Sequence, residues 1–317
     1  MRLLFAGTPA VAVPSLDALL ASDHEVLAVL TRPDAPVGRK RVLTPSPVKA
    51  RALEVGLPVL EADRLRGDVL TEIESLEPDA VAVVAYGALA GPRALAAARH
   101  GWFNLHFSLL PHWRGAAPLQ RAIMAGQEES GVTVFRLDTG MDTGDIVRST
   151  PFALPEIDAG EALERFARDG AAELVAALDA VAAGTAAYTA QPAEGTHAEK
   201  ITTAEARLDF ARPAAVVSAH ARGVSPAPGA WALLGGARTK LAGIRTAPGA
   251  PSPGVGTVAT GTVAGESCVL IGTADGAVTV ERIQPFGKPW MDAEAFLRGY
   301  GAVTFDAVDA DGDGAGA

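Results

Sequence analysis

The sequence predicts an α/β protein in which a doubly wound, mostly parallel sheet is followed by a small C-terminal β-barrel. Two observations carry this prediction. Short apolar runs alternate with helical patterns through residues 1–180, which is the order expected of parallel strands joined by helices. From about residue 206 the pattern changes to short β-like runs separated by Gly and Pro, as in barrels of the OB type.

The N-terminal elements alternate between strand and helix. Residues 79–85 form a continuous apolar run, which is expected of a strand covered on both faces. The other predicted strands are 3–6, 25–31, 102–107 and 132–137, and the predicted helices are 11–21, 48–55, 92–99, 119–125 and 161–182. Ligands bind at the carboxyl ends of strands in such sheets, and Gly7, Tyr86 and Asn104 fall there.

The change of pattern also predicts the domain organisation. The C-terminal strands are expected at 230–234, 239–244, 256–263, 267–271 and 277–283, with a closing helix at 291–298. We therefore divide the chain into a first domain (1–183), a linker (184–205), an OB-like domain (206–305) and a disordered acidic tail (306–317). The tail resembles the start of a calcium loop but ends before the Glu that such a loop needs at its twelfth position.

The composition of the chain indicates where the protein is located and which partners it can bind. The net charge of −10 by itself argues against nucleic acid. However, residues 206–305 hold nine Lys and Arg against six Asp and Glu, and a basic cluster lies at 39–41, so a local positive patch is available. The single cysteine, Cys268, excludes an internal disulfide, which fits the cytoplasm. No apolar run reaches the ~18 residues of a membrane span.

Two segments hold the polar residues that are candidates for chemistry. Asn104 and His106 stand two apart on a predicted strand, so both side chains face one side of the sheet. A loop at 137–145 carries three carboxylates, among them Asp142. An amide and an imidazole can stabilise the oxyanion of acyl transfer to an amine, while a carboxylate orients the imidazole and helps a proton leave the amine. The residues alone leave two alternatives open: Asn104 and His106 can satisfy loop backbone groups, and Asp142 can be a turn residue.

Motifs along nearly the whole chain match one known family. They lie at residues 5–9, 31–39, 45–49, 85–87, 104–118, 141–145, 198–201, 205–209 and 283–288. With these motifs the chain resembles the methionyl-tRNA formyltransferases. The Asn-x-His motif and the downstream Asp are shared by formyltetrahydrofolate-using transferases in general. The Trp-Arg-Gly-Ala-Ala-Pro stretch and the basic loop point to the tRNA branch.

This resemblance implies a Rossmann-like formyltransferase domain in which Asn104, His106 and Asp142 are catalytic. The implied reaction transfers a formyl group from 10-formyltetrahydrofolate to the α-amino group of methionyl initiator tRNA, for translation initiation, and the OB-like domain contacts the tRNA. The implied folate-binding residues are Tyr86, Gly87, Ser108, Leu109, Leu110 and Pro111. The implied tRNA-binding residues are Arg39, Lys40, Arg41 and Lys49, on an exposed mobile loop. We expect no metal, no membrane and no obligatory protein partner.

One segment departs from the family pattern. Where an aromatic-rich turn of the Asn-Pro-Trp-Pro kind is expected, the chain has Ser225-Pro226-Ala227-Pro228. The missing aromatic residue concerns domain packing or a substrate contact, and it leaves the chemistry untouched.

Other functions fit less well. A formyltransferase acting on an amino-sugar nucleotide, or a 10-formyltetrahydrofolate hydrolase, shares the catalytic residues but has a different second domain. A non-catalytic RNA-binding module needs only the OB-like domain. The chain lacks the G-x-G-x-x-G of a nicotinamide-dependent oxidoreductase and the P-loop of a nucleotidase. His100, His106 and His112 recur at six-residue intervals without the Cys or paired carboxylates of a zinc site.

Overall fold

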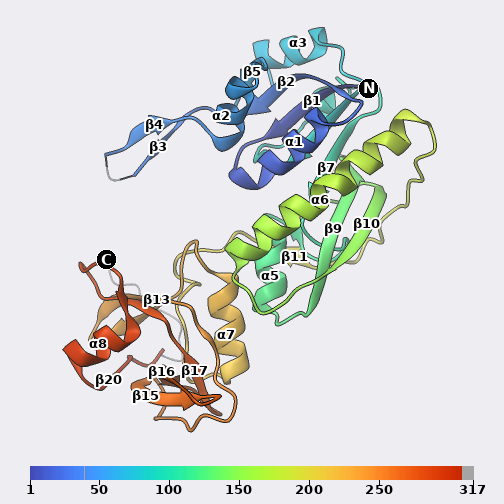
Figure 1. Ribbon diagram of the computed structural model, residues 1–317. Helices are drawn as coiled ribbons and strands as arrows, with labels where there is room; N and C mark the ends of the chain where they lie inside the picture. Colours follow the sequence, from blue (N-terminus) through green and yellow to red (C-terminus); the bar gives the residue numbers. More distant parts are fainter. Residues whose placement is uncertain (39, 309–317) are drawn as a thin grey trace. The chain divides into compact units, whose positions relative to one another are not determined.

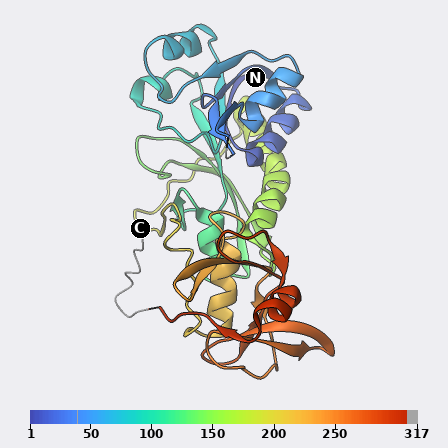
Figure 2. The ribbon, with the colours of Figure 1, turned by 90° about the vertical axis from the view of Figure 1, so that its left-hand side faces the viewer.

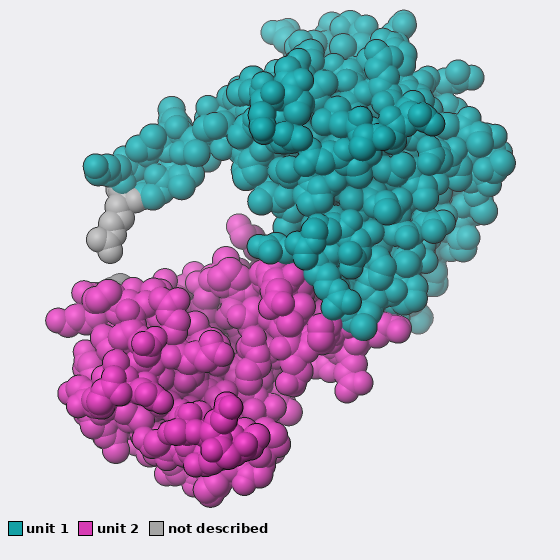
Figure 3. All heavy atoms as spheres, in the orientation of Figure 1, with its two compact units in different colours: residues 1–118, 130–153, 163–198 teal, residues 119–129, 154–162, 199–317 magenta. Residues whose placement is uncertain are grey.

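The computed structural model describes residues 1–38 and 40–308, and its contacts divide the chain into two compact units (Figures 1 and 3). Unit 1 comprises residues 1–118, 130–153 and 163–198, and unit 2 comprises residues 119–129, 154–162 and the described residues from 199 onward. The predicted domain and linker boundaries stay predictions. Arg39 and residues 309–317 of the predicted tail lie outside the described residues.

Unit 1 is built on a seven-stranded sheet with the strand order β10-β9-β7-β6-β1-β2-β5. Its strands are β1 (Arg2–Gly7), β2 (Glu25–Thr31), β5 (Val59–Glu61), β6 (Ala80–Val84), β7 (Trp102–His106), β9 (Glu129–Arg136) and β10 (Ile146–Ala153). The neighbours from β7 to β5 pair in parallel, whereas β9 is antiparallel to β7. The predicted mostly parallel sheet is confirmed.

Helices cover both faces of this sheet. One face carries α1 (Val13–Leu20), α2 (Pro47–Glu54) and the part of α6 (Ala159–Ala182) that belongs to unit 1, and the other carries α3 (Asp68–Ser75) and α4 (Pro92–Leu95) (Figures 1 and 2). All five residues of β6 are buried, because side chains on both of its faces meet a helical layer. This explains the continuous apolar run in the sequence. Helix α4 ends earlier than predicted, since the N–H groups of Arg99 and His100 donate to Pro78 and Asp79 instead.

A short antiparallel hairpin lies within the loop that the sequence predicts at the end of β2. Its strands are β3 (Ala35–Val37) and β4 (Val42–Thr44), so the segment is more regular than the predicted loop. After the hairpin, Ser46 caps α2 by accepting a hydrogen bond from the N–H of Lys49, and Pro47 occupies the first helical turn. The Ser46 hydroxyl also lies 2.8 Å from the hydroxyl of Thr31, which ties α2 to the end of β2.

A two-residue strand follows the carboxyl end of β7. It is β8 (Arg114–Gly115), and it pairs in parallel with β11 (His197–Ala198), which comes from the far side of α6 in the sequence. Gly115 has φ +124°, and a Cβ at this position would stand 2.7 Å from the carbonyl oxygen of Ala198. Only glycine fits this close approach of two backbones. The pairing fixes the backbone of residues 113–116 next to β7.

Unit 2 contains two sheets, with the orders β12-β13-β18-β19 and β14-β17-β16-β15-β20. The strands are β12 (Trp231–Leu234), β13 (Ala237–Ala242), β14 (Arg245–Thr246), β15 (Thr257–Val263), β16 (Glu266–Gly272), β17 (Ala277–Thr279), β18 (Arg282–Gln284), β19 (Met291–Asp292) and β20 (Val303–Thr304), and the helices are α5 (Pro118–Met124), α7 (Ala214–Gly223) and α8 (Ala293–Tyr300). Neighbouring strands are antiparallel, and both sheets contribute to one apolar core. The predicted β-rich second fold is confirmed, and α7 is an element that the sequence pattern does not indicate.

None of the helices in the described part of the chain combines the length and the hydropathy needed to cross a membrane.

Candidate active site

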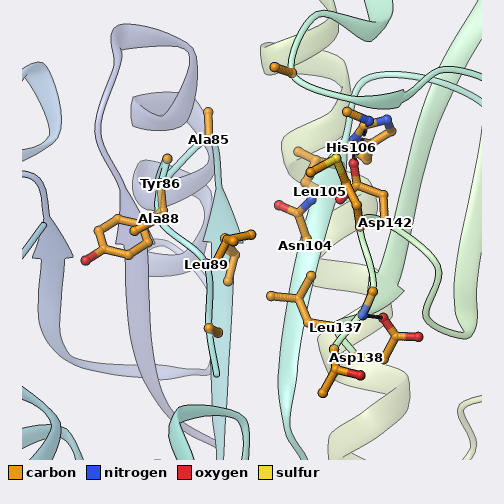
Figure 4. Close-up of a pocket in the computed structure, with 18 of the residues that line it drawn as sticks. Ala85, Tyr86, Ala88, Leu89, Asn104, Leu105, His106, Leu137, Asp138 and Asp142 are labelled. Atoms are coloured by element: carbon orange, nitrogen blue, oxygen red, sulfur yellow. Dashed lines mark hydrogen bonds and ion pairs between the residues drawn. The ribbon is translucent and has the colours of Figure 1, made fainter. Parts of the chain in front are cut away.

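The candidate site lies at the carboxyl ends of β6 and β7 in unit 1. Asn104 and His106 leave β7 on the same face, as their spacing predicts, and the loop after β9 brings Asp142 beside His106 (Figure 4). The parallel arrangement of β6 and β7 places the segment that begins at Ala85 against this face. The three residues that the sequence analysis named as catalytic are therefore close together.

His106 is buried, and its two ring nitrogens have different neighbours. Nε2 lies 2.9 Å from the carbonyl oxygen of Trp113, which can only accept, so Nε2 carries the proton. Nδ1 lies 3.8 Å from Oδ2 of Asp142. Burial lowers the pKa of His106, while Asp142 and the Trp113 carbonyl act in the opposite direction. The imidazole is therefore neutral near pH 7, with the lone pair of Nδ1 on the side of the Asp142 carboxylate.

The three carboxylates of the loop at 137–145 have different roles in the structure. Asp138 is the turn residue, because its Oδ1 accepts from the Gly140 N–H at 2.9 Å and from the Thr143 hydroxyl at 2.8 Å. Asp145 forms an ion pair with Arg136. Asp142 alone of the three faces His106. The sequence leaves open whether Asp142 is a plain turn residue, and this geometry favours an active-site position.

Asp142 itself is held by the backbone of β8. Its Oδ2 accepts a hydrogen bond from the Gly115 N–H at 2.8 Å, and its own backbone has φ +54°. This conformation is unusual for a residue other than glycine, and it directs the carboxylate toward β7 rather than into solvent. The carboxylate is only partly exposed.

Asn104 differs from its neighbours in having a free side chain. Within residues 1–38 and 40–308 its amide has no hydrogen-bond partner, and the residue lines the cavity described below. The alternative that Asn104 satisfies a loop backbone group is therefore not supported by the contacts. His106, by contrast, does satisfy one, through Nε2. The Asn104 amide is available to a ligand.

A cavity of about 680 Å³ opens beside these residues. Ala85–Leu89 form one wall, and β7 with the loop at 137–142 forms the other (Figure 4). The apolar residues that line it are Val83, Ala85, Ala88, Leu89, Ala90, Pro92, Leu105, Phe107, Ala116, Pro118, Leu137 and Met141. A mostly apolar wall with a few polar groups gathered at one place is typical of a small-molecule site, and the volume suits a ligand of drug size.

The predicted folate residues fall into two groups. Tyr86 and Gly87 belong to the lining, but the phenol of Tyr86 is buried, donates to the Ala62 carbonyl at 2.8 Å, and points away from Asn104 (Figure 4). Burial raises the pKa of Tyr86 to about 12. Residues 108–111 are not among those that line the cavity. The Ser108 hydroxyl instead donates to the His112 carbonyl at 2.6 Å. The folate contacts of residues 108–111 stay predictions.

The predicted tRNA-binding residues are also dispersed. Lys40 and Arg41 are exposed between β3 and β4, beside the exposed apolar side chains of Val37, Val42 and Leu43. Lys49 lies on α2, where its ammonium group pairs with Asp34 at 2.7 Å and Glu61 at 2.9 Å. These two hydrogen-bonded carboxylates raise the pKa of Lys49. A tRNA contact by Lys49 stays a prediction, and it would compete with both carboxylates.

One residue that contacts the loop of the candidate site is not among the predicted site residues. Gln191, in the segment between α6 and β11, donates from Nε2 to the carbonyls of Asp142 (3.0 Å) and Gly144 (2.8 Å). No pattern in the sequence singles out this residue. Among the residues that the structure describes, no group of three or more His, Cys, Asp or Glu side chains is arranged to hold a metal ion.

The family model described as formyl transferase matches residues 1–178, and the model of the formyl transferase C-terminal domain matches residues 200–301. The chain belongs to the formyl transferase family.

Two similar relatives show to which branch of the family the chain belongs. A methionyl-tRNA formyltransferase of Paenarthrobacter aurescens (strain TC1) is 50% identical, with 94% of this chain and 97% of the relative covered. A methionyl-tRNA formyltransferase of Arthrobacter sp. (strain FB24) is 49% identical, with 96% and 98% covered. At this identity and coverage, the branch of the family to which the chain belongs is that of the methionyl-tRNA formyltransferases.

Solved structures share the fold at lower identity. HypX from Aquifex aeolicus in complex with tetrahydrofolic acid has a TM-score of 0.63 at 18% identity, covering 94% of this chain and 47% of that chain. The N-formyltransferase from Helicobacter canadensis, in complex with folinic acid and dTDP-3-aminofucose, has a TM-score of 0.64 at 18% identity, covering 90% and 100%. These similarities concern the fold alone.

Proposed function

We propose that this chain transfers the formyl group of 10-formyltetrahydrofolate to the α-amino group of methionine on initiator tRNA. The observation that carries the proposal is the convergence of a free amide, a buried imidazole and a carboxylate at one mostly apolar cavity. Relatives that are about half identical over nearly the full length bear the name of this activity. We also propose that residues 206–305, with their surplus of basic residues, contact the tRNA. A cytoplasmic location stays a prediction.

The roles proposed for the three residues agree with their contacts. The formyl donor, when bound, supplies the carbonyl that the amine attacks. The Asn104 amide donates to the carbonyl oxygen as negative charge develops there. Because Nε2 of His106 is engaged with Trp113, Nδ1 is the atom that takes the proton lost by the amine. Asp142 stabilises the imidazolium that then exists, which can return the proton to the leaving nitrogen.

The cavity fits a folate in its general chemistry. The ring system of a folate needs a largely apolar slot, and the apolar residues of the wall at 85–90 supply one side of it. The donor end then lies toward Asn104 and His106, where the polar groups are. A binding measurement with tetrahydrofolate and the Leu137→Trp variant tests this placement, because the larger side chain takes up part of the cavity next to Asn104.

The central test is an acceptor comparison. We expect formyl transfer from 10-formyltetrahydrofolate to methionyl initiator tRNA, with much less transfer to methionyl elongator tRNA and none to a 4-amino-sugar nucleotide. Formylated product on each acceptor is measured alongside free formate. Formylation of the sugar, or release of formate with no product on either tRNA, would assign the chain to another branch of folate-using transferases.

The hairpin between β3 and β4 gives a second prediction. The double variant Lys40→Ala/Arg41→Ala is expected to lower kcat/KM for the tRNA while kcat at saturation changes little. The plot of log(kcat/KM) against log salt concentration should lose about 1 in slope for each phosphate contact removed, because fewer counterions are released. The measurement is initial-rate kinetics at several salt concentrations.

A matched control separates this contact from a change in net charge. Arg64 and Arg66 are also exposed cations of unit 1, and Arg64→Ala/Arg66→Ala removes the same charge elsewhere. An unchanged salt slope in the hairpin variant, or an equal change in the control, contradicts a role for the hairpin in tRNA binding.

A further inference from the structure

The segment at 113–115 contacts both ionisable residues of the proposed active site. The Trp113 carbonyl accepts from His106, and the Gly115 N–H donates to the Asp142 carboxylate. Between them, the side chain of Arg114 is directed to the segment that precedes β11. One short strand therefore holds His106 and Asp142, and Arg114 links it to a distant part of the sequence.

Arg114 is a buried arginine whose acceptors are neutral oxygens. Nε and Nη2 donate to Oε1 of Gln191 at 3.2 and 2.9 Å, while Nη2 also donates to the Pro192 carbonyl and Nη1 to the Ala193 carbonyl. Only 4% of Arg114 is exposed. A buried guanidinium demands such acceptors, so this arrangement holds the Gln191 side chain in one orientation.

The amide nitrogen of Gln191 donates hydrogen bonds to the loop at 137–145. Nε2 carries two hydrogens, and they satisfy the carbonyls of Asp142 at 3.0 Å and Gly144 at 2.8 Å. One is the carbonyl of Asp142 itself and the other follows two residues later, so both bonds hold the backbone that carries the Asp142 carboxylate and the turn directly after it. The left-handed backbone of Asp142 is costly, and an external pair of hydrogen bonds stabilises it.

We infer that Gln191, oriented by Arg114, is a positioning residue that holds the Asp142 carboxylate against His106 during formyl transfer. The inference rests on the proposed function, since it requires Asp142 to be catalytic. Gln191 itself lies at the back of the loop and acts only through the backbone of Asp142. Its loss moves the carboxylate without removing it.

The first two variants distinguish the hydrogen-bond donor of the Gln191 side chain, Nε2, from its acceptor, Oε1. Gln191→Ala removes both functions, whereas Gln191→Glu keeps an oxygen for Arg114 but places a carboxylate against the two carbonyls. Both are expected to lower kcat about tenfold or more, since a displacement near 1 Å can cost about 100-fold. KM for donor and tRNA should change less than about threefold, because Gln191 does not line the cavity and is engaged with Arg114 and the loop carbonyls. Glu194→Ala, an exposed residue of the same segment, is the control and should retain full activity.

A double-variant cycle tests whether Gln191 acts through Asp142. In the Asp142→Asn background, Gln191→Ala should add less than about a twofold loss, since the group that it positions no longer functions. Additive losses overturn the inference, as does a wild-type kcat in both Gln191 variants. If Asp142→Asn itself leaves kcat unchanged, the proposed catalytic role of Asp142 fails instead. Thermal unfolding of each variant verifies that the chain is folded.

Discussion

Asn104→Ala is expected to reduce kcat for formyl transfer by roughly 10²–10³, the usual effect of removing one oxyanion donor. The amide has no partner among the described residues, so its removal leaves no buried group unsatisfied and the fold should be unaffected. KM for the tRNA should stay close to that of the parent protein. The measurement is single-turnover formylation with saturating donor, together with tRNA binding.

Asn104→Asp is the sharper companion variant. The side chain keeps its shape, but a carboxylate replaces the donor and repels the charge that develops on the formyl oxygen. We expect a loss at least as large as that of the alanine variant. An Asn104→Ala enzyme with more than about a third of the original kcat would exclude the amide from the reaction.

The buried strands were predictable because hydrophobic periodicity reports burial. Residues 25–31 were predicted as a strand, and β2 has the same bounds. The sequence pattern does not predict β10, because all eight of its residues are exposed or half-buried at the edge of the sheet. A strand of that kind has no apolar run. Helix α3 was missed for a related reason, since only Leu70 and Ile73 of its eight residues are buried.

The candidate site was predictable where it depends on local spacing. Side chains two residues apart on a strand point to the same face of the sheet. Asn104 and His106 have this spacing, and both line the cavity. Which carboxylate of the loop at 137–145 faces His106 depends on how the loop turns, and that turn is set by contacts of Asp138. Gln191 lies 49 residues from Asp142 and binds backbone carbonyls, which every residue has. The pattern of side chains in the sequence therefore cannot predict the contact between Gln191 and the loop.

The second large effect is expected at Asp142. Asp142→Asn should lower kcat by roughly 10²–10⁴, the range of a lost acid–base partner, because an amide no longer stabilises the imidazolium at His106. The Asn side chain retains an oxygen that can accept from the Gly115 N–H, so the loop keeps its hydrogen bond. Single-turnover rates and tRNA binding of the folded variant are the measurements, with binding expected to be unchanged.

Comparison with Asp142→Ala distinguishes chemistry from structure. The alanine variant loses the charge and also the acceptor for Gly115, and a left-handed backbone is less favourable for Ala than for Asp or Asn. If the carboxylate is needed for proton transfer, both variants lose most of kcat, and Asp142→Ala is in addition less stable to heat. If Asp142 only shapes the turn, Asp142→Asn keeps the parent rate while Asp142→Ala does not. That outcome would leave His106 as the sole ionisable catalytic residue of the site, with its proton transfers independent of a carboxylate.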